Sequence, residues 1–295
     1  MTRIVLITLL ALTLAGCGDS EPDAAVVAAF YPLAYAAERV GDAEVRNLTP
    51  PGVEPHDFEL SGRDVETIAG AELVLYLGQG FQPALEAAVA STDANALDLL
   101  EGLDLLQGDD DRGEEEPHEG EDEEHAGEGG FDPHVWLDPL VYAELVERIG
   151  GTLGREAAAR ELVAELEQLD DEFRQQLADC ERRELVTSHA AFGYLTERYD
   201  LEQVAITGLS PEAEPTPGEL RDVVDEVREH GATTIFFETL VSPRLAETVA
   251  REVGATTAVL NPLEGLTEQQ AEDGEDYFSV MRANLASLRT ALGCS

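Results

Sequence analysis

Short apolar runs alternate with amphipathic helical patterns along this chain of 295 residues, and the alternation occurs twice. The first half contains four such runs, each of strand length: Ala25–Phe30, Glu44–Leu48, Leu73–Leu77 and Ala96–Leu99. The second half contains four more: Leu185–Ser188, Gln203–Ile206, Thr233–Phe237 and Thr257–Leu260. Strands that alternate with helices in this way are typical of parallel βα units. The pattern therefore predicts an α/β protein with two parallel sheets.

A long helix is predicted between the two sets of strands, over Arg155–Ala178. Its apolar stripe consists of five residues spaced three or four apart: Leu162, Leu166, Leu169, Phe173 and Leu177. Roughly 24 helical residues extend about 36 Å, which is enough to cross a domain. We therefore expect two Rossmann-like βα lobes joined by a long rigid helix. A ligand would bind in the interdomain cleft, at the carboxyl ends of the strands.

The boundaries of the lobes follow from a helix-start signal in the middle of the chain. Asp138 is followed by Pro139, and an aspartate cap with proline in the first turn is typical of a helix start. We therefore assign residues 25–137 to the N-terminal lobe, 138–179 to a helical connector and 180–295 to the C-terminal lobe.

The first 17 residues have the pattern of a secretory signal. Their apolar run, Ile4–Leu14, is shorter than the roughly 20 residues that a membrane-spanning helix needs. The sequence Leu-Ala-Gly-Cys, which ends at Cys17, resembles the bacterial lipobox. That resemblance implies lipidation of Cys17, a polar tether over residues 18–24 and a mature protein held outside the cytoplasm. The alternatives are an ordinary signal peptide that ends near Ala15, or a buried strand.

Two cysteines remain if Cys17 carries a lipid, namely Cys180 and Cys294. Thiols in an oxidising compartment are more often paired than free, so a disulfide between them is expected. It would close a loop of about 114 residues, and a loop near that size contributes up to roughly 4.7 kcal/mol in the chain-entropy model. Two buried free thiols are the alternative.

The charge of the chain limits its partners, because 62 acidic residues face only 18 basic ones and the formal net charge is −44. Such a surface repels phosphate, which excludes nucleic acid as a partner, and it attracts cations. All basic residues are arginines, so adaptation to high salt, or a GC-rich genome, is the alternative explanation of the background charge.

About a quarter of this charge lies in a low-complexity segment, residues 107–130, which we predict to be a disordered insert. It contains twelve acidic residues and two histidines, His118 and His125. The insert would collect cations weakly, or it is a solvated surface loop with no required role.

Three histidines lie at strand exits or helix entries. His56 follows a proline-rich loop after a strand, His134 precedes the helix start at Asp138, and His189 directly follows a strand. Each alone would usually be a core or capping residue. In a chain that attracts cations, three imidazoles and one carboxylate or water form a typical tetrahedral zinc site.

Four segments around these positions resemble the metal-ligand segments of the zinc and manganese solute-binding proteins of ABC importers. They are Pro55–Ser61 (PHDFELS), Asp132–Pro139 (DPHVWLDP), Ser188–Tyr194 (SHAAFGY) and Asn261–Thr267 (NPLEGLT). The resemblance extends from about Ala25 to the C-terminus. It implies two α/β lobes, joined by a long helix, that trap one ion between them.

The resemblance also implies a ligand set, with His56 and His134 from the first lobe and His189 and Glu264 from the second. The manganese branch has a carboxylate at the position of His189, and imidazole favours Zn²⁺ over Mn²⁺.

The fourth ligand is less fixed across the family than the three histidines, and Glu264 is preferred here. Asn261 and Glu238 are expected either to hold a ligand in place or to substitute for Glu264.

The predicted function is the capture of Zn(II) outside the cytoplasm and its delivery to an ABC permease, by a lipoprotein anchored to the cell membrane. The same role for Mn(II) or Fe(II) is the alternative, and a surface adhesin is a more distant one. A zinc hydrolase is disfavoured because the chain lacks the His-Glu-x-x-His motif, so the protein is not expected to be an enzyme.

Overall fold

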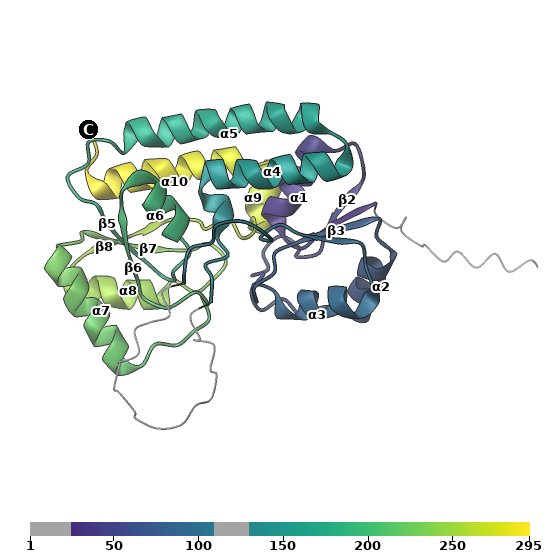
Figure 1. Cartoon of the computed structure of the whole chain (residues 1–295). Coiled ribbons are helices and arrows are strands. Elements are labelled where there is room, and N and C mark those ends of the chain that lie inside the picture. The colour runs from purple at the N-terminus through teal and green to yellow at the C-terminus, as the bar shows by residue number, and fades with distance from the viewer. Residues whose placement is uncertain (1–24, 109–129) are drawn as a thin grey trace, which may run out of the picture.

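The computed structural model describes residues 25–108 and 130–295, and it contains two parallel four-stranded sheets side by side (Figure 1). The predicted signal segment, Cys17, the tether and both histidines of the insert lie outside the described residues. The two-lobed α/β fold expected from the alternation is confirmed.

The first lobe has the strand order β2-β1-β3-β4. Its strands are β1 (Val26–Ala28), β2 (Val45–Asn47), β3 (Leu73–Tyr76) and β4 (Ala96–Asp98). The helices between them are α1 (Tyr31–Val40), α2 (Gly62–Gly70) and α3 (Pro83–Thr92). The chain leaves β1 on one side to form β2 and returns to the other side to form β3. This reversal of strand order leaves a crevice at the carboxyl ends of the strands.

The second lobe repeats this plan with the strand order β6-β5-β7-β8. Its strands are β5 (Glu184–Thr187), β6 (Glu202–Ala205), β7 (Thr234–Phe237) and β8 (Thr256–Val259). Its helices are α6 (Gly193–Tyr199), α7 (Pro217–His230), α8 (Arg244–Val253) and α9 (Glu268–Asp273). The same reversal occurs at β5, so the two lobes present equivalent ends of their sheets.

A short 3-10 helix, η1 (Val135–Leu137), precedes the predicted connector, and the connector contains α4 (Pro139–Leu153) and α5 (Glu156–Gln176). Helix α4 ends because Gly154 adopts a left-handed conformation, with φ of 65°, which a residue with a side chain disfavours. All five residues of the predicted stripe on α5 are buried. Helix α5 runs across the top of both lobes, as the long stripe indicated (Figure 1).

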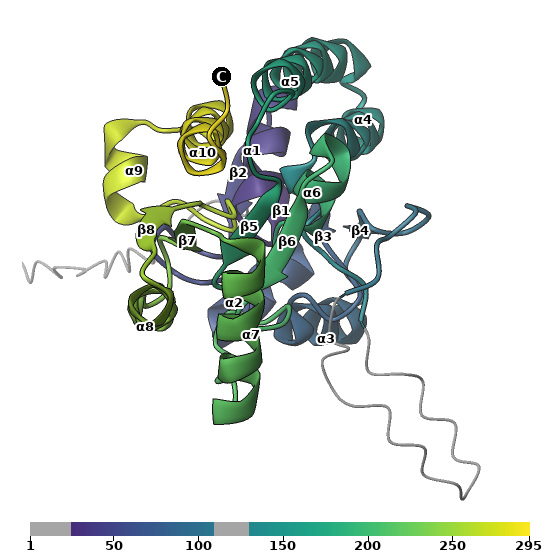
Figure 2. The ribbon, with the colours of Figure 1, turned by 90° about the vertical axis from the view of Figure 1, so that its left-hand side faces the viewer.

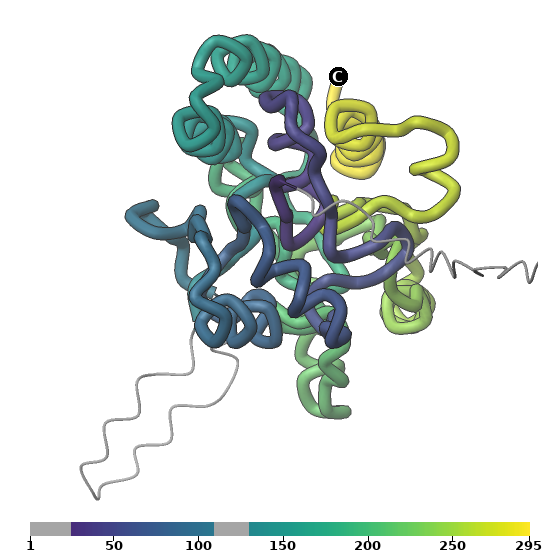
Figure 3. Tube along the Cα trace, turned by 90° about the vertical axis from the view of Figure 1, so that its right-hand side faces the viewer, coloured from purple at the N-terminus to yellow at the C-terminus, as the bar shows by residue number. Residues whose placement is uncertain are grey.

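The last helix, α10 (Tyr277–Leu292), packs beside the connector and closes the chain. Helix α1 lies between α10 and the α4–α5 pair (Figures 2 and 3). The ring of Tyr35 on α1 stacks on that of Tyr277, with centroids 6.0 Å apart. One hydrophobic core extends from the first sheet through these helices, and a smaller one lies between the second sheet, α7 and α8.

A disulfide joins Cys180, just beyond α5, to Cys294, just beyond α10. The pairing expected from the cysteine count is confirmed. It fastens the end of the chain to the point where the second lobe begins, and so holds α10 against α5.

Two further observations concern the ends of the acidic segment and the lengths of the helices. Gln107 and Phe131 form an antiparallel bridge that brings the two ends of the acidic segment together. Among the residues that the structure describes, no helix is both long enough and apolar enough to span a bilayer.

Candidate metal centre

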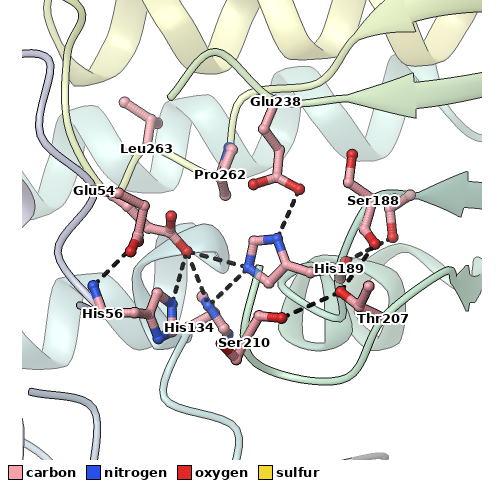
Figure 4. Close-up of polar contacts among 12 residues, drawn as sticks. Glu54, His56, His134, Ser188, His189, Thr207, Ser210, Glu238, Pro262 and Leu263 are labelled. Carbon is pink, nitrogen blue, oxygen red and sulfur yellow. Dashed lines mark hydrogen bonds and ion pairs between the residues drawn. The ribbon is translucent and has the colours of Figure 1, made fainter. Parts of the chain in front are cut away.

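Four side chains that are distant in the sequence meet between the two lobes: His56, His134, His189 and Glu264. Each offers one ligand atom, and all four atoms lie within 4.8 Å of one another. The Nε2 atoms of the three histidines lie 3.2, 3.1 and 3.2 Å from Oε1 of Glu264, in chain order. Figure 4 shows the rings of His56, His134 and His189 directed at one common point. The structure thus brings together all four residues of the predicted ligand set.

His56 lies on the loop between β2 and α2, which is stiffened by three prolines. The loop also contacts the second lobe, because the N–H of Gly52 donates to the carbonyl of Leu266 at 2.8 Å. Glu54 accepts from the backbone N–H of His56 at 3.1 Å, and the ring of Phe81 lies edge-on to the imidazole at 4.7 Å. With 11% of its side chain exposed, His56 is the most accessible of the four.

His134 lies in the segment that leads into η1, and its side chain is fully buried. Asp132 holds it twice, because Oδ1 accepts from the backbone N–H of His134 at 2.9 Å and from its Nδ1 at 2.7 Å. A carboxylate on Nδ1 fixes the tautomer and aims Nε2 at the metal position. Sequence reasoning missed this role of Asp132, although an aspartate two residues before the histidine was the available signal.

The segment that carries His134 is anchored to the second lobe. The indole N–H of Trp136 donates to the carbonyl of Pro262 at 2.7 Å, and the hydroxyl of Tyr277 donates to the carbonyl of Trp136 at 2.7 Å. Arg198 on α6 forms an ion pair with Asp138 at 2.7 Å. Trp136 is buried, and its ring lies 5.3 Å from that of His134. These contacts fix the position of His134 relative to the ligands of the second lobe.

His189 follows β5 and is also fully buried. Its Nδ1 donates to Oε1 of Glu238 at 2.7 Å, and Glu238 directly follows the neighbouring strand β7 (Figure 4). Adjacent parallel strands end at the same edge of a sheet, so the two residues meet there. Of the two roles considered for Glu238, the geometry corresponds to holding a ligand.

Glu264 lies on a turn after β8 that two asparagines shape. Asn284 accepts from the N–H of Asn261 at 2.9 Å and donates to its carbonyl at 2.7 Å. The side chain of Asn261 in turn accepts from the N–H of Leu263, which has a left-handed conformation with φ of 57°. Asn261 thus directs the turn that presents Glu264, and its side-chain oxygen is engaged there.

The carboxylates around the histidines change the proton affinity of the site. Burial alone would raise the pKa of Glu264, but the imidazoles of His189 and His56 hold it well below its usual value of 4.5. Burial lowers the pKa of His134 and His189, and the carboxylates beside them outweigh it, so both pKa values are raised. Burial and the charge of Glu264 raise the pKa of Glu54 to about 8.

The donor set favours one class of metal ion. Three imidazole nitrogens and one carboxylate oxygen match the tetrahedral coordination of Zn²⁺. Mn²⁺ prefers more oxygen ligands, and Ca²⁺ prefers six to eight of them. The ligands of the centre therefore suit a borderline-soft divalent ion that loses its water shell when it binds.

Known proteins share this arrangement of sequence and fold. A family model described as ZnuA, zinc-uptake complex component A periplasmic, matches residues 26–291. The high-affinity zinc uptake system protein ZnuA of Bacillus subtilis is 35% identical over 294 residues, which cover 94% of this chain and 90% of that protein. The zinc-binding protein AdcA of Streptococcus pyogenes is 34% identical over 92% of this chain, which spans only 56% of that longer protein.

A solved structure gives the same result for the fold. The Zn(II)-bound ZnuA-like domain of Streptococcus pneumoniae AdcA aligns with a TM-score of 0.72 and 33% identity, over 90% of this chain and 98% of that one. Because the family model covers nearly the whole described chain and these identities exceed 30%, the chain belongs to the ZnuA family of zinc-uptake components.

Proposed function

We propose that this protein captures Zn(II) outside the cytoplasm and delivers it to an ABC permease. The observation that carries the proposal is the convergence of three Nε2 atoms on one oxygen of Glu264, between the lobes. The ion is the cargo, and its binding joins a loop of the first lobe to strand ends of the second.

In this proposal His56, His134 and His189 bind the ion through Nε2 and Glu264 binds it through its carboxylate. Four protein ligands complete a tetrahedral shell, so no position is left for a reacting water molecule. A closed shell supports binding and release rather than hydrolysis, and the protein would act as a carrier and not as an enzyme.

The charge around the centre supports capture of a cation. Asp132 and Glu238 lie beside the ligands, and they add negative charge to a buried site that also contains Glu264. Carboxylates that accept from Nδ1 increase the basicity of the imidazoles and hold their rings in place. The site is therefore arranged before the ion arrives.

Titration of the purified mature protein with Zn²⁺ against a competing chelator tests the proposal, with elemental analysis of the metal bound. We expect one tightly bound zinc, and we expect its affinity to fall steeply in His189→Ala protein. Tighter binding of Mn²⁺ or Fe²⁺ than of Zn²⁺ would contradict the assignment of the cargo.

The identity of the ion can be tested further through His189. A His189→Glu substitution replaces the imidazole by an oxygen donor, so we expect the preference for Zn²⁺ over Mn²⁺ to fall. An unchanged preference would contradict the argument from ligand type.

We also propose that the protein is anchored to the cell membrane through a lipid on Cys17. The support is the Leu-Ala-Gly-Cys sequence after an apolar run of signal length. Cells that express the Cys17→Ala protein should release it in soluble or uncleaved form without labelled fatty acid, whereas the wild type should stay in the membrane fraction. Delivery is tested in the same cells, because zinc uptake that depends on the protein should require both the permease and the four ligands.

A further inference from the structure

A second group of metal-binding side chains lies in the second lobe, at the opposite end of its sheet. Glu184 begins β5, Glu202 begins β6 and His230 ends α7. Each offers one ligand atom, and the three atoms lie within 4.8 Å of one another. Glu184 precedes His189 by five residues along an extended strand, which corresponds to roughly 16 Å. The group is therefore separate from the centre between the lobes.

The topology of the lobe brings these residues together. Glu184 and Glu202 are direct partners in the parallel pairing of β5 with β6, so their side chains point to the same face of the sheet. Helix α7 packs near β6 and ends with His230. Nδ1 of His230 lies 3.8 Å from Oε1 of Glu184. The imidazole and both carboxylates therefore face one small region of the surface.

Two like charges side by side on neighbouring strands repel each other, and a cation would remove that repulsion. Arg183, which precedes Glu184 in the chain, does not neutralise the two carboxylates. The guanidinium of Arg183 is used elsewhere, donating to the carbonyl of Leu177 at 3.0 Å and to Asp200 at 3.4 Å. Only its backbone N–H reaches the pair, at Oε2 of Glu184. Within the part of the chain that the structure describes, no arginine forms an ion pair with Glu202.

We propose that Glu184, Glu202 and His230 form a second, weaker Zn²⁺ site. Histidine nitrogens and carboxylate oxygens both bind zinc, and water would complete the coordination of these three ligands. The site would be weaker than the centre between the lobes because it has one protein ligand fewer. Its side chains are also more exposed, with 25% of the Glu184 side chain and 34% of the His230 side chain accessible. Water and dissolved salt therefore screen the attraction between these ligands and the ion more strongly.

Occupation of this site would join two strands to the end of a helix. An ion that binds only the folded state stabilises it by mass action. The second site would therefore stabilise the second lobe in excess zinc, without delivering an ion to the permease. It would also add to the zinc counted in a titration of the whole protein.

Equilibrium dialysis of the full mature chain with Zn²⁺ alone tests the proposal. The wild type should bind one zinc tightly and further zinc more weakly. Glu202→Gln and His230→Gln should each weaken one of the weaker sites at least about tenfold, because loss of a ligand costs no less than loss of a ligand's supporting group. The tight site should stay within twofold of the wild type. Glu229→Gln is the matched control, since it removes one charge from the same helix without removing a ligand.

A direct readout separates this site from the centre between the lobes and from the acidic segment. In His189→Ala protein, the imidazole ¹⁵N resonances of His230 should shift as Zn²⁺ is added, and the same shift should need at least about tenfold more Zn²⁺ when Glu202→Gln is also present. No zinc-dependent shift of His230, or weak binding that is unchanged in both site variants, would overturn the proposal. Failure of the tight site in the wild type would contradict the proposed transport function but leave this inference intact.

Discussion

The loop that carries His56 and the three other ligands belong to one centre, but the protein holds them in different ways. His134, His189 and Glu264 are almost completely buried, and a side chain orients each ligand or its turn. His56 is partly exposed, and its only side-chain hydrogen bond among the described residues is made by Nε2, with Glu264. Three ligands thus form a fixed platform, and the fourth is positioned by the backbone of its loop. We call His134, His189 and Glu264 the platform ligands.

The largest expected effect compares removal of a platform ligand with removal of His56. Metal binding in four-ligand zinc sites is worth on the order of 10–16 kcal/mol, so one ligand contributes roughly 3 kcal/mol or 100-fold in affinity. We expect His56→Ala to weaken zinc binding about 100-fold. His189→Ala should weaken it about 1000-fold, because it also leaves Glu238 buried without its partner. Chelator competition measures both, and equal losses would contradict the distinction.

The pH dependence of zinc affinity separates the same two regions. The pKa values of His134 and His189 are raised, so protons occupy these imidazoles up to a higher pH than usual and zinc must displace them. Affinity should therefore fall as the pH falls, roughly tenfold per pH unit for each proton displaced, or about 100-fold from pH 7.5 to 5.5 for one proton. The His56→Ala protein should keep most of this dependence. A flat profile in that variant would contradict the assignment of these protons to His134 and His189.

Replacing the carboxylates beside the ligands should give smaller losses of zinc affinity than replacing the ligands themselves. Asp132→Asn and Glu238→Gln remove the charge beside a platform imidazole, and we expect each to weaken zinc binding about 10-fold to 100-fold. Glu54→Gln should change affinity by less than about threefold, because an amide oxygen can still accept from the backbone N–H of His56. Isothermal titration measures all three. A larger loss from Glu54→Gln than from Glu238→Gln would contradict the platform description.

The smallest effect concerns the backbone of the His56 loop. Gly52 has φ of 82°, and a Cβ there would lie 3.4 Å from Glu268, so Gly52→Ala should cost about 1 kcal/mol of folding stability. Zinc affinity should fall slightly, because the loop that carries His56 would shift relative to the second lobe. Gly62→Ala is the matched control, since a Cβ at that position meets nothing within 4 Å. Urea unfolding and zinc titration of both variants distinguish the two positions.

The sequence predicts features that depend on local spacing. The stripe on α5 follows from helical periodicity, and the position of His189 follows from its place after an apolar strand. Glu264 has no such signal, since nothing in the spacing of its segment distinguishes it from the glutamates that lie on the surface. It was inferred from the resemblance alone, and the structure places it beside the three imidazoles.

Features that depend on packing between distant segments were not predictable from patterns. The anchoring of Trp136 by Pro262 and Tyr277 joins residues that are far apart in the chain, so no local periodicity encodes it. The left-handed conformation of Leu263 would be unfavourable alone, and it persists because Asn261 and Asn284 fix the turn. The antiparallel packing of α4 on α5 likewise has no local signal, because it depends on contacts between the two helices.

Trp136 allows metal binding to be followed by intrinsic fluorescence. It is the only tryptophan of the chain, and it packs against the imidazole of His134. Excitation of indole in this molecule therefore samples a single location, a few ångströms from where the cargo would sit. Arrival and departure of the ion can be followed as a change in emission, in real time and without a dye.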